Sequence, residues 1–157
     1  MKQTLIALFL CGSVMSATAA GGVAPDAKAQ EAAAVLAEFS QRSGLSEEEL
    51  NGWLADCDSS QQSMYFCAYR DVVAAERAFR RALTEKAQRL PKCKTSLESK
   101  AASWIQARDR SCEKSAKQDY GGGSMEPTAK LICMSSSTES MTKRLKSKHK
   151  NNCTFPQ

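Results

Sequence analysis

The clearest pattern in the sequence is an apolar stripe with helical spacing between Ser63 and Leu90. Apolar residues recur there at steps of three, four or seven, at Tyr65, Tyr69, Val72, Phe79, Leu83 and Leu90. This is the period of one face of an α-helix, and Pro91 supplies the stop. The pattern predicts one long amphipathic helix over about residues 63–90.

Two further helices are predicted downstream by the same period. One begins near Thr95 or Ser96 and ends before Gly121-Gly122-Gly123; the other starts after Ser124, with Pro127 near its first turn. The two stripes are Leu97, Ala101, Trp104, Ile105 and Cys112, and then Leu131, Met134, Thr138, Met141 and Leu145. The sequence holds no strand-turn-strand pattern. The expected fold class is therefore all-α, a small up-down-up helical bundle.

The residues ahead of this bundle predict a helical appendage. An Ala-rich run from Asp26 through Phe39 favours helix, and Gly44 is placed as its C-terminal stop. Ser46 and Glu49 form a capping box that opens a second, short helix. Residues 21–55 thus predict a hairpin. A partly ordered arm is the alternative, because alanine side chains bury little area.

The first twenty residues have the features of a secretory signal peptide. A basic start at Lys2 precedes an apolar run from Thr4 to Leu10 and a small-residue cleavage site near Ala19 or Ala20. The apolar run is too short to span a bilayer, so we expect no transmembrane segment in the mature chain. The predicted location is the periplasm or the exterior.

Cysteine usage agrees with export. Of seven cysteines in 157 residues, Cys11 leaves with the leader, and six remain: Cys57, Cys67, Cys93, Cys112, Cys133 and Cys153. An even number in a small exported chain predicts three disulfides. Because neighbouring cysteines are at least ten residues apart and the chain has one histidine, no metal site and no cofactor are expected.

Distances along the helices select one of these disulfides. Cys93 lies 29 residues before Gly122 and Cys153 lies 31 after it. At about 1.5 Å per residue the two heights agree within roughly 3 Å, which a disulfide can bridge. We predict a Cys93–Cys153 bond. Cys57, Cys67, Cys112 and Cys133 then pair among themselves, in any of three ways.

The net charge of +5 is the sum of an acidic N-terminal part and a basic C-terminal part. Residues 21–91 carry eight basic and eleven acidic residues, whereas the chain from Lys92 onward carries 13 basic and six acidic. The strongest basic run, Lys143 to Lys150, is either a solvated last helical turn or a surface for anionic envelope polymers. Nucleic acid is disfavoured, because no aromatic residues interleave this run.

No catalytic set emerges from the sequence. His149 lies in the basic run beside no nucleophile, the serines lack a G-x-S-x-G setting, and the cysteines are assigned to disulfides. We therefore expect no catalytic residues and a non-enzymatic protein.

Three segments of the C-terminal half form a recognisable combination. Residues 102–112 read ASWIQARDRSC, residues 120–127 read YGGGSMEP, and Cys133 and the run TKRL at 142–145 follow. Together they resemble the LprI-type lysozyme inhibitor domain, an exported bacterial family, over about residues 56–147. The resemblance implies an LprI-like cysteine-rich domain at 56–157 whose partner is a lysozyme or another peptidoglycan hydrolase. The Cys93/Cys153 pair and residues 26–55 fall outside the common pattern.

Trp104 and Arg108 are spaced i,i+4, which allows an indole–guanidinium contact. Trp104, Ile105 and Pro127 are interpreted as structural. Arg108 either holds a nearby acid and helix-end carbonyls or presents a cation beside the glycine loop.

The glycine loop itself either makes a simple turn or projects backbone N–H groups and a hydroxyl at a helix start, where acidic groups are favoured. Such donors would suit a lysozyme cleft, which is built around two carboxyl groups. The candidate partner-binding residues are Arg108, Lys117, Tyr120, Gly122, Gly123, Ser124, Glu126 and Lys130. The acidic residues that would suit a basic partner are Glu47, Glu48, Glu49, Asp56 and Asp58.

The leading hypothesis is inhibition of a lysozyme or other peptidoglycan hydrolase, for evasion of host defence or for periplasmic immunity. The alternative is an envelope-associated structural or adaptor protein that holds anionic cell-wall or outer-membrane polymers through the basic C-terminal helix.

Overall fold

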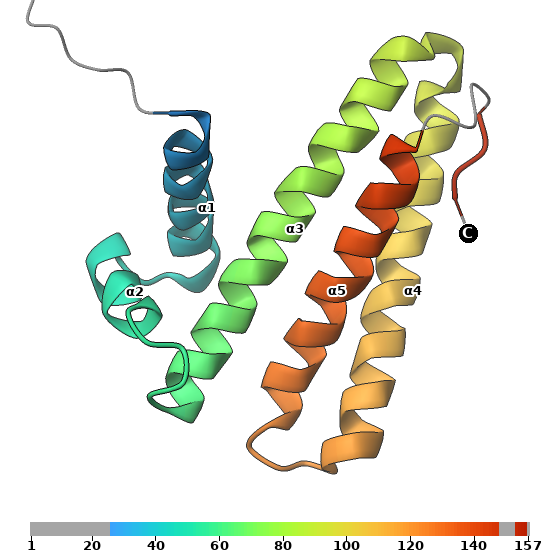
Figure 1. Cartoon of the computed structure of the whole chain (residues 1–157). Helices are drawn as coiled ribbons and strands as arrows, with labels where there is room; N and C mark the ends of the chain where they lie inside the picture. The colour runs from blue at the N-terminus through green and yellow to red at the C-terminus, as the bar shows by residue number, and fades with distance from the viewer. Residues whose placement is uncertain (1–25, 148–152, 157) are drawn as a thin grey trace, which may run out of the picture.

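Helices account for most of the computed structural model, which describes residues 26–147 and 153–156. They are α1 (Ala27–Ser43), α2 (Glu47–Leu54), α3 (Gln61–Arg89), α4 (Lys94–Tyr120) and α5 (Glu126–Lys146), with the 3-10 turn η1 (Pro91–Cys93) between α3 and α4. Helices α3, α4 and α5 run up, down and up, and α1 and α2 lie on the other side of α3 (Figure 1). The described residues contain no strand, and the all-α bundle is confirmed.

Local capping explains where the first two helices begin and end. The Asp26 carboxylate accepts the Ala29 N–H at 2.7 Å, and Gly44 ends α1 in the left-handed region at φ 76°. The predicted capping box at the start of α2 is present, with the Ser46 N–H donating to the Glu49 carboxylate at 2.8 Å. Residues 27–54 therefore form a helical hairpin.

Helix α3 serves two separate hydrophobic clusters, and here the prediction of a single stripe was wrong. Its first half packs Phe66 and Val73 against Phe39 of α1 and Leu50 of α2. Its second half packs Phe79 and Ala82 against α4 and α5, in a cluster with Leu97, Ala101, Met141 and Leu145. Helix α3 also buries Cys67, Val72 and Ala75 in its first half, so it is packed on more than one face rather than along a single stripe.

Three disulfides join the described cysteines. Cys93 bonds to Cys153, as the helix heights predict, with Cα atoms 5.0 Å apart. The four cysteines whose pairing was open form Cys57–Cys67, which ties the α2–α3 loop to α3, and Cys112–Cys133, which ties α4 to α5.

The C-terminal segment folds back onto the bundle. Phe155 is buried with its ring 6.5 Å from that of Phe79, and the Lys86 ammonium donates to the Thr154 carbonyl at 3.3 Å. The predicted leader, residues 1–20, lies outside the described residues. Among the helices that are described, none has the length and apolar character required to cross a bilayer.

Candidate functional site

The connection between α4 and α5 forms a tight turn, which we call the α4–α5 tip and define as residues 117–126. Gly121 and Gly122 take φ values of 52° and 83°, a region that other residues rarely enter. A Cβ at Gly123 would lie 2.9 Å from the Tyr120 carbonyl oxygen. All three glycines are therefore needed for the chain to reverse here.

The backbone donors of the tip are already paired within the chain. The N–H groups of Gly121 and Gly123 donate to the carbonyls of Lys117 and Tyr120, and that of Gly122 donates to the Glu126 carboxylate at 2.6 Å. Of the two interpretations of this loop, the observed hydrogen bonds fit the simple turn and not N–H groups that project towards an outside acid. Glu126, in the first turn of α5, fills that role itself because the helix start favours a negative charge.

Other candidate residues of the tip are also engaged. The Ser124 hydroxyl accepts from the Gln61 amide at 2.8 Å, and the Lys130 ammonium pairs with Glu113 at 2.8 Å. Lys117 and Tyr120 remain exposed, Tyr120 with 48% of its surface accessible. Within the predicted set, the Lys117 ammonium and the Tyr120 hydroxyl are therefore the exposed side-chain donors that hold no other described residue, and the exposed Ser124 hydroxyl, which accepts from Gln61, can still donate its O–H.

Arg108 is not at the tip, and its assignment to a partner-binding surface was wrong. Its side chain is 2% exposed, and it lies 13 residues before Gly121 on α4, about 20 Å along the helix. Its guanidinium bonds Glu76 at 2.8 Å and the Thr138 hydroxyl at 2.6 Å, and its Cζ lies 5.6 Å from the centre of the Trp104 ring. A long cation in a helix interface is buried only when acids and π faces surround it, as they do here.

The residues marked as structural lie in or beside the core. Trp104 and Ile105 are partly buried against the bundle cluster, with the Trp104 ring 5.2 Å from Phe79. Pro127 stands in the first turn of α5, where its missing N–H costs no hydrogen bond.

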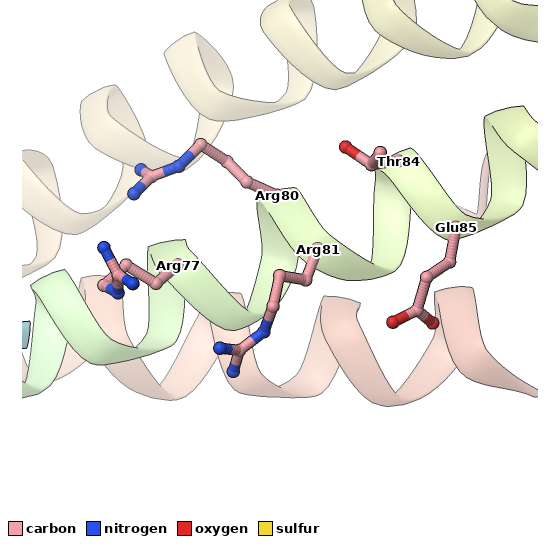
Figure 2. A pocket seen from close by; sticks show the side chains of 5 residues that line it. All are labelled: Arg77, Arg80, Arg81, Thr84 and Glu85. Atoms are coloured by element: carbon pink, nitrogen blue, oxygen red, sulfur yellow. The ribbon is translucent and has the colours of Figure 1, made fainter. Parts of the chain in front are cut away.

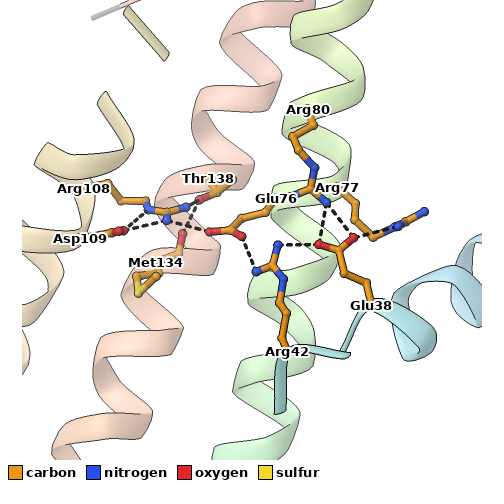
Figure 3. Close-up of polar contacts among 9 residues, drawn as sticks. All are labelled: Glu38, Arg42, Glu76, Arg77, Arg80, Arg108, Asp109, Met134 and Thr138. Atoms are coloured by element: carbon orange, nitrogen blue, oxygen red, sulfur yellow. Dashed lines mark hydrogen bonds and ion pairs between the residues drawn. The ribbon is translucent and has the colours of Figure 1, made fainter. Parts of the chain in front are cut away.

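Arg108 belongs to a charge network that crosses the whole molecule. Figure 3 shows Glu76 of α3 between Arg108 of α4 and Arg42 of α1, with Arg42 at 2.7 Å. Arg42 also pairs with Glu38, and Glu38 in turn accepts from Arg77 and Arg80 of α3. Glu38 therefore pairs the hairpin with α3 directly, and Glu76 links Arg42 of the hairpin to Arg108 of α4.

The acids of this network are held ionised. Burial by itself would raise the pKa of Glu76, but hydrogen bonds from Arg42 and Arg108 outweigh it and hold that pKa below its ordinary value. For Glu38, burial is likewise outweighed by hydrogen bonds from Arg77, Arg80 and Arg42, which lower its pKa. The folded protein therefore binds fewer protons at these two groups than the unfolded chain does.

Acid is expected to destabilise the protein through these carboxylates. A lowered folded-state pKa contributes stability that is complete above the unfolded pKa and lost as the pH falls through the folded one. The free energy of unfolding should therefore be level from pH 7 to about pH 5 and fall below about pH 4.5. Urea unfolding at a series of pH values measures this. A stability that rises between pH 5 and pH 3 would contradict the role given to Glu76 and Glu38.

A shallow cavity of about 310 Å³ on α3 is lined by arginines, yet it is a weak anion site. Its lining is Arg77, Arg80, Arg81, Thr84 and Glu85. Figure 2 shows Arg80 leaving the helix on one side and Arg81 on the other, so the guanidinium groups do not converge. Arg81 bonds Glu31, and Arg77 bonds both Glu31 and Glu38. These cations serve the packing of α1 on α3.

The sequence held only a partial signal for this network. The spacings of Glu38 to Arg42 and of Glu76 to Arg80 are i,i+4, which indicates charge pairs along one helix. Glu76 instead pairs across helices, with residues 34 positions before it and 32 positions after it. Such partners follow from helix packing and cannot be derived from spacing.

The basic run at the end of α5 is only partly described. Lys143, Arg144 and Lys146 are exposed on the last turn of the helix, whereas Lys148, His149 and Lys150 lie outside the described residues. Within the part of the chain that is described, no cluster of three or more His, Cys, Asp or Glu side chains could hold a metal ion.

Comparison with known proteins adds one match. A family model described as "Lysozyme inhibitor LprI" matches residues 55–145, which include α3, α4, the α4–α5 tip and all of α5 except its last residue. The helical hairpin, residues 27–54, precedes the matched range. No curated protein and no solved structure matches the chain.

Proposed function

We propose that this protein, which belongs to the LprI family of lysozyme inhibitors, binds a lysozyme or another peptidoglycan hydrolase and blocks its cleft. The family match, which covers more than half of the chain, is the observation that carries the proposal. Membership of an inhibitor family favours a binding role over catalysis.

The α4–α5 tip is the part of the fold best suited to enter a cleft. It is a narrow turn at the end of the bundle (Figure 1). The Cys112–Cys133 bond joins α4 and α5 about two helical turns away from it. A turn held rigid before binding loses little conformational entropy when it inserts, which favours affinity.

The chemistry of the exposed tip residues fits such a cleft. Glycoside hydrolases place two carboxyl groups beside the bond that they cleave. The Lys117 ammonium and the Tyr120 hydroxyl are donors that carboxylates accept, and tyrosine adds apolar contact area. In our proposal these two side chains occupy the space of the substrate.

Acidic residues near the tip would guide a basic lysozyme towards it. Asp56 and Asp58 are exposed in the α2–α3 loop. The hydrogen bond between Gln61 and Ser124 places the start of α3 against the tip. Opposite charges around a contact raise the rate of association more than the final affinity.

The proposed function requires that the protein be exported, and two features of the chain support this. The first twenty residues have the sequence of a secretory leader. The six cysteines that follow it form three disulfides, which persist in oxidising compartments. We propose that the protein acts in the periplasm or outside the cell, against a host lysozyme or as immunity against a secreted hydrolase.

Replacing both Lys117 and Tyr120 with alanine is expected to weaken inhibition by about 10- to 100-fold, the loss expected from a central interface contact. The measurement is the inhibition constant in a cell-wall lysis assay with purified oxidised protein. Because both side chains are exposed, the helical signal and the unfolding midpoint should not change. Lys100→Ala removes an exposed cation near the other end of α4 and is the matched control.

Two results would test the inhibitory function and the proposed contact surface separately. If the wild-type protein at stoichiometric concentration slows no animal c-type, g-type or bacterial muramidase, the inhibitor function itself is wrong. If it inhibits and the Lys117→Ala/Tyr120→Ala variant inhibits equally well, the function stands and the α4–α5 tip is not the contact surface.

A further inference from the structure

The N-terminal hairpin does not close fully onto α3, and an apolar groove remains between α1, α2 and α3. We call it the hairpin groove. Its volume is about 720 Å³, and its apolar lining consists of Ala32, Ala33, Val35, Leu36, Leu54 and Ala74. This volume is within the range of small-molecule sites, roughly 300–1,000 Å³.

Small side chains keep the groove open. Alanines line it on both α1 and α3, at Ala32, Ala33 and Ala74, where larger residues would bridge the space. The hairpin is held elsewhere, by the fully buried Phe39 and Leu50. Leu36 and Leu54 are only half-buried beside the groove. A ligand that covered them would remove further apolar surface from water.

The charged residues of the groove favour an anion. Lys28 and Arg70 both line it, together with one acid, Glu31. Glu31 is already bonded to Arg77 and Arg81. Arg70 pairs with its neighbour Asp71, which is 51% exposed, and such surface pairs contribute little. Two cations therefore stand beside an apolar lining whose acid is neutralised.

We propose that the hairpin groove binds a single-chain amphiphile with an anionic headgroup, such as a fatty acid or an alkyl phosphate. The hydrocarbon chain would lie along the alanine and leucine lining, and the headgroup would bond the ammonium of Lys28 and the guanidinium of Arg70. A basic hydrolase does not suit this groove, because the same two cations would repel it.

This site is separate from the proposed inhibitory function. Eight of the ten lining residues precede residue 55, where the family match begins. The hairpin contacts α3 but neither α4 nor α5, whereas the tip is formed by α4 and α5. Ligand binding here would thus be a property of this chain in addition to that of its family domain.

The test is isothermal titration of the purified oxidised protein with dodecanoate, dodecyl phosphate and dodecanol, each below its aggregation concentration. Both anions should bind at one site, and dodecanol about tenfold or more weakly, because it lacks the charged headgroup. The tighter of the two anions identifies the headgroup as carboxylate or phosphate. No saturable binding of either anion, or equal binding of dodecanol, would overturn the proposal.

Two variants test the place of binding. Ala33→Trp puts an indole into the groove and should weaken dodecanoate at least about 50-fold, since each methylene kept in water costs about fourfold. Ala37→Trp adds the same side chain to an exposed position of α1 that does not line the groove, and it should bind as the wild type does. Equal affinity of Ala33→Trp and wild type would contradict the site.

The charges are tested separately. Lys28→Gln with Arg70→Gln should bring dodecanoate to the affinity of dodecanol, whereas Arg110→Gln, an exposed cation on α4, should have no effect. An unchanged affinity in the double variant would show that the headgroup is not bound there. Inhibition of hydrolases by all four variants should equal that of the wild type, so that this proposal and the inhibitory function fail independently.

Discussion

Replacing Cys93 and Cys153 with serine is expected to lower the free energy of unfolding by about 4 kcal/mol. The bond joins residues 60 positions apart, the longest separation of the three disulfides. In the chain-entropy account, the closed loop restricts the unfolded ensemble, and the restriction grows with the logarithm of loop length. Because a domain of this size is stable by only about 5–15 kcal/mol, such a loss would be large.

Native contacts add to this effect. The bond holds the segment that seats Phe155 against Phe79 and brings the Thr154 carbonyl to Lys86. Without the bond, these contacts must be formed by a free chain end, which costs conformational entropy. We therefore expect the Phe155 segment to lose hydrogen-exchange protection before the bundle does.

Urea unfolding of oxidised protein measures the loss, and the other two disulfides are its controls. They span 21 and 10 residues, and their serine variants should cost about 3 kcal/mol each by the same relation. The expected order is therefore Cys93/Cys153 above Cys112/Cys133 above Cys57/Cys67. A variant of Cys57 and Cys67 that lost the most stability would contradict the entropic explanation.

The second large effect is expected at Glu76, where Glu76→Gln should cost about 3 kcal/mol. The Arg108 side chain is 2% exposed and loses its cross-helix carboxylate in this variant. Removing one partner of a buried pair leaves a charge that neither water nor an acid solvates, typically at 3–5 kcal/mol. We take the lower end because Glu76 is 18% exposed and Asp109 still contacts Arg108.

Thermal and urea unfolding of Glu76→Gln measure this cost. The matched control is Glu85→Gln, an exposed carboxylate on the same helix, which should change stability by less than about 0.5 kcal/mol. The variant should also weaken the fall in stability below about pH 4.5, since it removes one of the titrating groups. A cost below about 1 kcal/mol would show that the network does not hold the hairpin and bundle together.

A double variant tests the reason for the cost. The loss of stability in Glu76→Gln is explained here by a buried Arg108 that has lost its cross-helix carboxylate. If this explanation holds, Glu76→Gln combined with Arg108→Met should be more stable than Glu76→Gln alone. Methionine keeps the unbranched apolar length of the arginine and can still contact the Trp104 ring. A double variant less stable than either single variant would contradict the explanation that the cost comes from the unpaired Arg108 charge.

Local signals determined most of the fold. The capping box of Ser46 and Glu49, the αL position of Gly44 and the stops at Pro91 and the glycine turn place helix ends by interactions within a few residues. Counting helix rise from Gly122 also predicted the Cys93–Cys153 pair, although α5 ends at Lys146, before Cys153. The capping and stop residues and the residue counts can both be read from the sequence alone.

Local signals did not predict which of the functional side chains are exposed and which are buried. Arg108 and Lys117 are both cations on α4, yet one is buried in an ion network and the other is exposed at the tip. The glycine loop has the sequence of an anion-binding turn, but its Gly122 donor is taken by Glu126. Which donors remain free depends on acids that only the folded backbone brings close.

The sequence by itself determined the helices, their order, the cysteine-rich character and the family to which the protein belongs, because each is encoded in short-range spacing and motifs. Only the tertiary structure decided that Glu76 links the hairpin to α4, that Lys117 and Tyr120 are exposed at the tip, and that a groove lies between the hairpin and α3. These features depend on how helices distant in sequence pack, and packing is set by the fit of whole surfaces rather than by any one motif.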